Sequence, residues 1–96
     1  MKVRYTETAL SEVGEILSYI AENNPAAAAQ VVLAIEATVA RIGVFPNSAQ
    51  AADEPGVRMA PVGRFPYLVF YTVAVDEVEI LHVRHGARLR PWEKDR

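Results

Sequence analysis

The sequence predicts an α+β domain with the element order β-α-α-β-β-β, in which a helix hairpin packs on one face of a small, mainly antiparallel sheet. Three observations support this fold class. Two helix-like apolar stripes are separated only by the link Asn23-Asn24-Pro25, a short strand-like alternation precedes them, and two β-prone runs fill the last third of the chain. A chain of 96 residues is long enough for one domain, so we expect a single unit over residues 1–96, with about residues 89–96 as a C-terminal tail.

The first strand is predicted at residues 2–5, where charged and apolar residues alternate. Thr6 or Thr8 can cap the helix that follows, because a hydroxyl accepts hydrogen bonds from the free N–H groups of the first turn. Apolar residues then recur at spacings of three and four: Leu10, Val13, Ile16, Leu17 and Ile20. The polar residues expected on the opposite, solvent-facing side are Glu12, Glu15, Ser18 and Glu22. Gly14 lowers the helix propensity but is expected to permit a close approach between helices.

The second helix is predicted to begin at Pro25, with Asn24 as its N-cap, since proline suits the first helical position. Its apolar stripe consists of Ala28, Val31 or Val32, Ile35, Val39 and Ile42. We expect Gly43 to follow the last helical residue as the C′ position, and Pro46 forbids continuation. Two helices joined by so short a link form an antiparallel hairpin.

Residues 44–56 are predicted to be a loop, followed by a short strand at residues 57–62 that Pro61 confines to an edge or a strand end. Two longer strands are predicted at residues 65–73 and 78–84, with the turn at Asp76-Glu77. Alternation sends Tyr67, Val69, Tyr71 and Val73 to one face of the sheet and Leu68 and Phe70 to the other. Both faces are apolar, so we expect helices on one face and a binding partner on the other.

Composition excludes several classes of site. The chain has no cysteine, and His82 and His85 lie three positions apart on a predicted strand and therefore point to opposite faces. We expect no metal site and no cofactor. No apolar run approaches the roughly 18 residues that span a bilayer, and no signal peptide is evident, so we expect a cytoplasmic protein without membrane association. The net charge of −2 argues against direct, sequence-specific nucleic-acid binding by this chain.

Positive charge is nevertheless concentrated at one end of the predicted sheet. Arg84, His85, Arg88 and Arg90 fall within seven positions, and Arg58 and Arg64 precede them on the earlier strands. Several guanidinium groups that converge can hold phosphates or an acidic partner. The alternative is that they are solvated strand ends and a tail. Trp92 is either a docking anchor or a lid over the sheet edge.

The order of motifs along residues 2–92 resembles the ParE branch of the RelE/ParE toxin superfamily. The resemblance rests on Val3-Arg-Tyr-Thr with Ala9-Leu, on residues 16–25 (Ile-Leu-Ser-Tyr-Ile-Ala-Glu-Asn-Asn-Pro), on residues 66–71 (Pro-Tyr-Leu-Val-Phe-Tyr), and on residues 79–88, which end in His-Gly-x-Arg. It implies a bacterial plasmid-stabilisation type of system, in which a type II toxin is neutralised by a cognate antitoxin in a hetero-oligomer. That antitoxin is usually of the ribbon-helix-helix, ParD-like type. ParE-like toxins act on DNA gyrase, whereas RelE-like relatives cleave mRNA in the ribosome.

The fold cannot choose between these targets. An mRNA endonuclease would need catalytic groups, for which the candidates are His85 as the base, Arg64 and Arg84 for the phosphate, and Glu79 to orient the histidine. A ribosome binder should be strongly basic, which this chain is not, so we favour gyrase inhibition without catalytic residues. The residues we then expect to face the target are Arg64, Arg84, His85, Arg88 and Trp92. A silent toxin that serves only in antitoxin-dependent regulation remains a third possibility.

Overall fold

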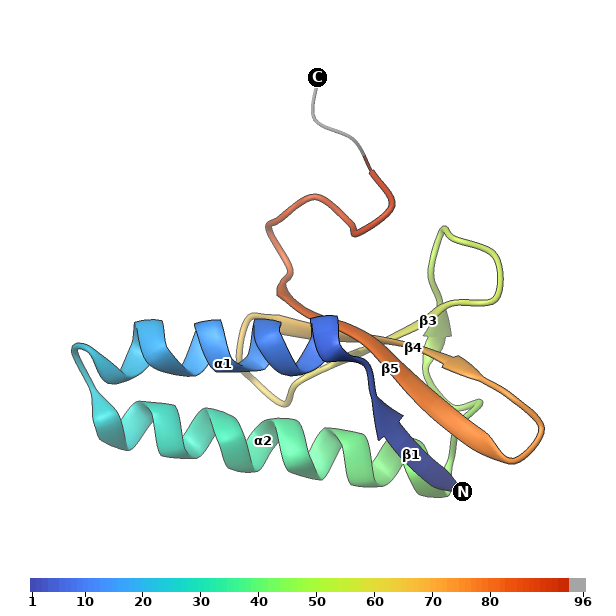
Figure 1. Ribbon diagram of the computed structural model, residues 1–96, viewed down its shortest axis with the longest axis horizontal. Helices are drawn as coiled ribbons and strands as arrows, with labels where there is room; N and C mark the ends of the chain where they lie inside the picture. The colour runs from blue at the N-terminus through green and yellow to red at the C-terminus, as the bar shows by residue number, and fades with distance from the viewer. Residues whose placement is uncertain (94–96) are drawn as a thin grey trace.

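The computed structural model describes residues 1–93 and consists of two layers, a helix hairpin and a five-stranded sheet (Figure 1). The elements are β1 (Lys2–Tyr5), α1 (Glu7–Ala21), α2 (Pro25–Val44), β2 (Gln50–Ala51), β3 (Arg58–Pro61), β4 (Tyr67–Val73) and β5 (Glu77–His85). The strand order is β1-β5-β4-β3-β2, with β1 parallel to β5 and the other pairs antiparallel. The predicted class and element order are confirmed, and the predicted loop contains one additional short strand, β2. The last three residues of the predicted tail lie outside the described residues.

The two predicted helix starts are confirmed. The Thr6 side chain accepts a hydrogen bond from the Ala9 N–H at 3.0 Å, and Asn24 Oδ1 accepts one from the Ala27 N–H at 3.1 Å. Each cap satisfies one of the donors that a helix leaves free in its first turn. Pro25 is the first residue of α2, where its missing N–H costs no hydrogen bond.

Three predictions about individual helix residues are wrong. Leu10 is 57% exposed rather than part of the core, because the buried side of α1 at this turn is centred on Ala9. Gly14 has no neighbouring atom within 4 Å of where a Cβ would stand, so it is not a point of close helix contact. Gly43 lies inside α2 instead of following it. A Cβ on Gly43 would stand 3.0 Å from Val3 Cγ2, and the Gly43 carbonyl accepts a hydrogen bond from the Met1 amine at 2.9 Å.

The core lies between α2 and the sheet. Its fully buried side chains include Tyr71 and Ile80, together with Val69, Val78 and Val83. The Tyr71 hydroxyl donates to the Pro46 carbonyl at 2.8 Å, which ties the segment after α2 to the sheet. Burial raises the pKa of this phenol above its ordinary value.

Among the described residues, α2 is the one helix whose length and mean hydropathy would suffice to cross a membrane. A core helix meets the same criteria. The buried side of α2 packs into this core through Val31, Ile35 and Ile42.

The β4–β5 hairpin contains an irregularity that strict alternation did not predict. Phe70 is opposite His82 and Tyr71 is opposite Ile80, so the register shifts between Phe70 and Tyr71. Val69, Phe70 and Tyr71 are all buried. Val69 and Tyr71 belong to the core under the helices, whereas Phe70 and its partner His82 belong to the sheet face away from the helices, here called the open face.

Candidate target-binding surface

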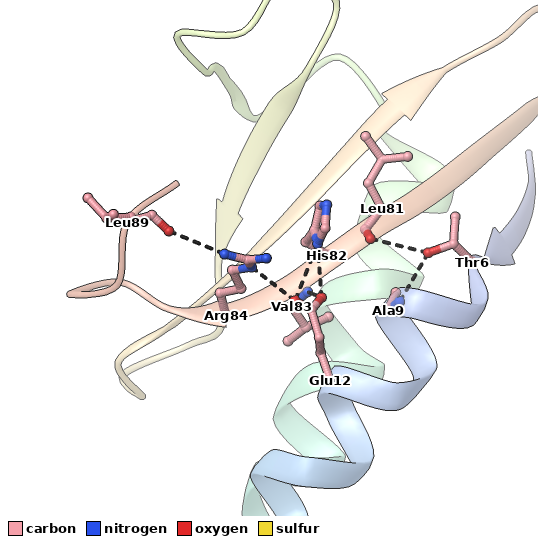
Figure 2. A network of polar contacts seen from close by, with 8 residues as sticks. All are labelled: Thr6, Ala9, Glu12, Leu81, His82, Val83, Arg84 and Leu89. Atoms are coloured by element: carbon pink, nitrogen blue, oxygen red, sulfur yellow. Dashed lines mark hydrogen bonds and ion pairs between the residues drawn. The ribbon is translucent and has the colours of Figure 1, made fainter. Parts of the chain in front are cut away.

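The first feature of the candidate site is a stretch of β5 that has no strand on one side. β1 pairs with β5 only as far as Tyr5 opposite Ile80. Beyond that point the side chains of α1 take the place of a strand (Figure 2). Thr6 Oγ1 donates to the Leu81 carbonyl at 3.2 Å, and Glu12 Oε1 accepts from the Val83 N–H at 3.2 Å. The helix thus supplies partners for backbone groups that would otherwise be unpaired at the sheet edge.

Glu12 also joins two basic side chains of the open face. Its Oε2 accepts from Arg84 Nε at 2.9 Å, and its Oε1 lies 3.1 Å from His82 Nδ1. The side chains of Glu12, Arg84 and His82 are 12%, 19% and 24% exposed, so this cluster is largely withdrawn from solvent. Charge-assisted hydrogen bonds in such a setting are stronger than those of exposed pairs. Arg84 is therefore a held side chain and not a freely moving one.

The placement of Glu12 corrects its expected position on the solvent-facing side of α1. A usable signal was present in the sequence. Glu12 lies three residues after Ala9 and four before Ile16, which places it on the same side of the helix as both. Ala9 is fully buried, and Ile16 packs against the core. What the sequence alone did not reveal is that an unpaired edge of β5 stands opposite this side.

The chain after β5 folds back across the open face; we call residues 86–93 the C-terminal strap. It leaves β5 on the side away from α2 (Figure 1). Trp92 meets Phe70 edge to face, with ring centroids 5.5 Å apart and an interplanar angle of 88°, and the Arg90 guanidinium lies 5.9 Å from the centre of the Phe70 ring. Phe70 is consequently only 1% exposed. The open face that we expected to await a partner is thus covered around Phe70 by the chain itself, and Trp92 is a lid there.

The predicted basic residues of the strap surround a pocket of about 350 Å³, lined by Arg84, Arg88, Leu89, Arg90, Pro91 and Glu93. Arg84 donates to the Leu89 carbonyl at 3.4 Å (Figure 2), and Arg90 donates through Nη1 to the Gly86 carbonyl at 3.1 Å. The Glu93 carboxylate accepts from the Arg90 N–H at 2.7 Å, so one negative charge stands at the same pocket. Arg88 is exposed. Of the arginines that line this pocket, it is the most accessible to a partner.

His85 and Arg64 lie at the same end of the sheet. His85 is on the helix side, in a pocket of about 250 Å³ lined also by Glu15, Ile16, Tyr19 and Tyr67. Its ring meets Tyr67 edge to face at 5.7 Å, and its Nδ1 accepts from the Ala87 N–H at 3.0 Å. Arg64 is exposed in the β3–β4 turn, and this turn is joined to the end of β5 by the hydrogen bond from the Gly86 N–H to the Pro66 carbonyl at 2.8 Å.

The structure does not bring Glu79 to His85. Glu79 lies six positions earlier on β5, where it pairs with Arg4 of β1, which also bonds Glu77 at 3.2 Å. Glu77 and Glu79 together raise the pKa of the Arg4 guanidinium above its usual value. The carboxylate that does contact a histidine of β5 is Glu12 of α1, but its partner is His82 instead of His85.

Comparison with known proteins places the whole domain in one group. A family model described as "ParE toxin of type II toxin-antitoxin system, parDE" matches residues 3–90. The chain is 33% identical over 90 residues to "Putative toxin Y4kP" of Sinorhizobium fredii, covering 94% of this chain and 93% of the relative. It is 30% identical over 88 residues to "Toxin RelE2" of Caulobacter vibrioides, covering 92% and 98%.

A solved structure described as "Chromosomal ParDE TA system from P. aeruginosa" has the same fold. The TM-score is 0.79, the matched region covers 88% of this chain and 95% of that chain, and the sequence identity is 22%. The likeness includes the sheet and both helices because it extends over nearly the full length of each chain.

Proposed function

We propose, from the premise that this chain belongs to the ParE toxin family of type II toxin–antitoxin systems, that it halts replication in the cytoplasm by inhibiting DNA gyrase. A cognate antitoxin, which we propose to be of the ParD-like, ribbon-helix-helix type, neutralises it in a hetero-oligomer. The toxin acts in this proposal by binding and performs no chemistry of its own.

The observation that carries the proposal is that the polar groups a nuclease would need are already bonded to other groups of the protein. General acid–base catalysis requires a base within reach of the substrate proton, with a cation at the phosphate. Glu12 holds Arg84, the backbone of Ala87 occupies His85 Nδ1, and Arg4 holds Glu79. His82 and His85 lie on opposite faces of β5. The candidate base His85 therefore lacks the carboxylate expected to orient it, which favours binding over catalysis.

The surface we propose for the target is the end of the sheet where Arg64, Arg84, His85, Arg88 and Trp92 lie. Arg64 and Arg88 are the exposed cations of this group. A guanidinium group presents several donors in a planar fork that suits carboxylates and phosphates, so these two side chains fit an acidic surface of gyrase or the DNA it holds. Trp92, which is partly exposed above the buried Phe70, supplies an adjoining aromatic contact area.

The test is a cleavage and supercoiling assay with the purified protein, gyrase from the same organism, plasmid DNA and ATP. We expect gyrase activity to be lost, or linear DNA to accumulate after protease treatment, and the effect to vanish when the antitoxin is added. Unimpaired supercoiling without linear product would contradict gyrase inhibition. A parallel reaction with translating ribosomes would then identify mRNA cleavage, and normal growth on expression without antitoxin would identify a silent toxin.

Two paired variants test the surface. Arg64→Ala combined with Arg88→Ala removes two exposed cations without touching the Glu12 cluster, and we expect it to weaken inhibition by about tenfold or more. The matched control combines Lys2→Ala with Arg41→Ala, which removes two exposed positive charges from β1 and α2. Equal inhibition by both double variants would exclude this end of the sheet. Antitoxin binding measured alongside reports whether each variant is folded.

A further inference from the structure

We infer that Glu12 is a positioning residue: through Arg84 it fixes the C-terminal strap on the open face and thereby sets where Arg88 and Trp92 stand. The structural part of this inference concerns the chain alone. Its consequence for target binding rests on the proposed function.

The first step is the anchoring of Glu12 itself. Its carboxylate is bonded to the backbone of β5 through the Val83 N–H, and its side chain is only 12% exposed. A carboxylate bonded to a backbone N–H of the sheet is held in place, whereas the side chains of an exposed ion pair move freely. The carboxylate therefore presents its second oxygen, Oε2, in a fixed position toward Arg84 (Figure 2).

The second step is the relay through Arg84. Its Nε donates to Glu12 at 2.9 Å, and its Nη1 donates to the Leu89 carbonyl at 3.4 Å. One guanidinium thus joins a rigid carboxylate to the backbone of the strap. Because guanidinium is planar, fixing Nε also fixes the direction in which Nη1 points. If Glu12 no longer accepts from Nε, the bond to Leu89 loses its orientation.

The third step is that the described part of the strap has few other backbone ties. Beyond Gly86 at its base, its backbone hydrogen bonds are local. The Arg88 and Ala87 N–H groups donate to the carbonyl and Nδ1 of the adjacent His85 at 3.1 and 3.0 Å. The other bonds lie within the strap, between Arg90 and Glu93 and between Arg90 and the Gly86 carbonyl. Apart from the Arg84 bond and the turn at His85, the strap meets the sheet through the packing of Trp92 and Arg90 on Phe70, beside Leu81 and His82. Segments with so few buried contacts open at low free-energy cost. The Arg84 link is therefore a substantial share of what keeps the strap in place.

Glu12→Gln separates the two roles of Glu12. Glutamine keeps a carbonyl oxygen that can accept from the Val83 N–H, but its amide nitrogen cannot accept from Arg84 Nε. The variant should still fold, with a modest loss of thermal stability, while releasing Arg84. Trp92 is the only tryptophan of the chain, so its fluorescence reports the strap directly. We expect a red-shifted emission and stronger acrylamide quenching in Glu12→Gln, and wild-type fluorescence in the control Glu22→Gln, an exposed residue at the end of α1.

A second measurement tests whether Glu12 acts through Arg84. In an Arg84→Ala background, Glu12→Gln should cause no further change in Trp92 quenching, since the relay is already broken. Wild-type fluorescence of Glu12→Gln, or a full additional change in the Arg84→Ala background, would overturn the inference. Glu12→Gln preserves the length of the side chain, so any change in fluorescence comes from the lost acceptor group.

Failure of this inference can be told apart from failure of the proposed function. The fluorescence test uses the isolated protein and needs no gyrase. If the wild type does not inhibit gyrase, the proposed function is wrong. The positioning role of Glu12 is then still decided by the fluorescence of Trp92. If the wild type inhibits gyrase, Glu12→Gln should inhibit less strongly. Unchanged inhibition despite a released Trp92 would overturn the functional half of the inference.

Discussion

At the scale of single residues, Glu12 shows how one carboxylate can serve the backbone and two side chains at once. It accepts from the Val83 N–H and from Arg84 Nε, and it contacts His82. A buried carboxylate is costly unless such partners compensate for its lost hydration. Here the partners come from three successive residues of β5, so the ion and the strand edge stabilise one another.

Replacing Glu12 by leucine should destabilise the fold. Leucine leaves the Val83 N–H and the Arg84 guanidinium without their acceptor, and we expect a loss of about 2 to 4 kcal/mol in the free energy of unfolding. Glu12→Gln keeps the backbone bond and should cost about 1 kcal/mol. Urea denaturation of both variants measures the difference. Equal losses would mean that the backbone bond contributes little.

Tyr71 leads to a prediction about alkaline stability. Burial raises the pKa of its phenol, so above a pH of about 10 the unfolded chain ionises this group while the folded chain does not. The stabilisation is fully present below that pH and is lost as the pH rises further. We expect the free energy of unfolding of Tyr71→Phe to fall less steeply in this range than that of the wild type.

The same denaturation series should include Tyr5→Phe. Burial, and then the nearby negative charge of Glu36, also raise the pKa of Tyr5. Each single variant should therefore remove part of the alkaline loss. An identical pH dependence in the wild type and in Tyr71→Phe would show that the Tyr71 phenol ionises equally in both states.

At the scale of elements, the close contact in this fold is between β1 and the end of α2. Val3 stands 3.0 Å from the position of a Gly43 Cβ, and the Met1 amine donates to the Gly43 carbonyl. The glycine inside α2 costs helix propensity but lets β1 lie against the helix. β1 in turn places Arg4 beside the acidic residues of β5.

Substitutions at two glycines separate the effect of helix propensity from that of packing. Gly14→Ala adds a methyl group in open space within α1, and we expect it to raise the free energy of unfolding by about 0.5 to 1 kcal/mol. Gly43→Ala should show no such gain, because Val3 must move, and Gly43→Leu should cost about 2 kcal/mol or more. Thermal denaturation of the three variants decides this. A gain at Gly43 equal to that at Gly14 would show that β1 yields easily.

The elements were predictable where a local signal determined them. Thr6, Asn24 and Pro25 mark the helix starts correctly because capping depends on neighbouring residues. Gly43 was placed after α2 because nothing local distinguishes a glycine that ends a helix from one that accommodates a strand from elsewhere. The register shift at Phe70 was missed for the same reason, since a bulge depends on both strands of a pair.

At the scale of the whole molecule, charge is distributed very unevenly. The chain carries a net charge of −2, yet Arg64, Arg84, Arg88 and Arg90 gather at the end of the sheet where β5 stops. Part of that positive charge is compensated within the protein: Arg84 is paired with Glu12, and the Arg90 guanidinium donates to the Gly86 carbonyl. Counting charges along the sequence grouped Arg58 with this end, but Arg58 donates instead to the Asn47 and Ala49 carbonyls of the loop after α2. It also could not tell that Arg84 is compensated, because Glu12 lies more than seventy positions away in the chain. Whether the cluster faces a target stays a prediction.

This distribution predicts a shallow salt dependence for target inhibition. With Arg64 and Arg88 as the exposed cations, few counterions are released on binding, and the logarithm of affinity should fall with the logarithm of salt concentration with a slope of about −2 or smaller in magnitude. Gyrase inhibition measured at several salt concentrations gives the slope. A much steeper slope would indicate a larger nucleic-acid contact than this surface offers.

The place of β5 in the sheet also sets when the protein can become active during its synthesis. β5 is the last strand in the sequence but stands between β1 and β4. At typical elongation rates of about 5 to 20 residues per second, a chain of this length takes about 5 to 20 seconds to make. For most of that time β1 has no strand to pair with, because β5 has not yet been synthesised. A nascent chain therefore cannot assemble the end of the sheet that we propose for target binding until β5 has been made. Under the proposed function, the toxin therefore stays inactive until its last strand has been made.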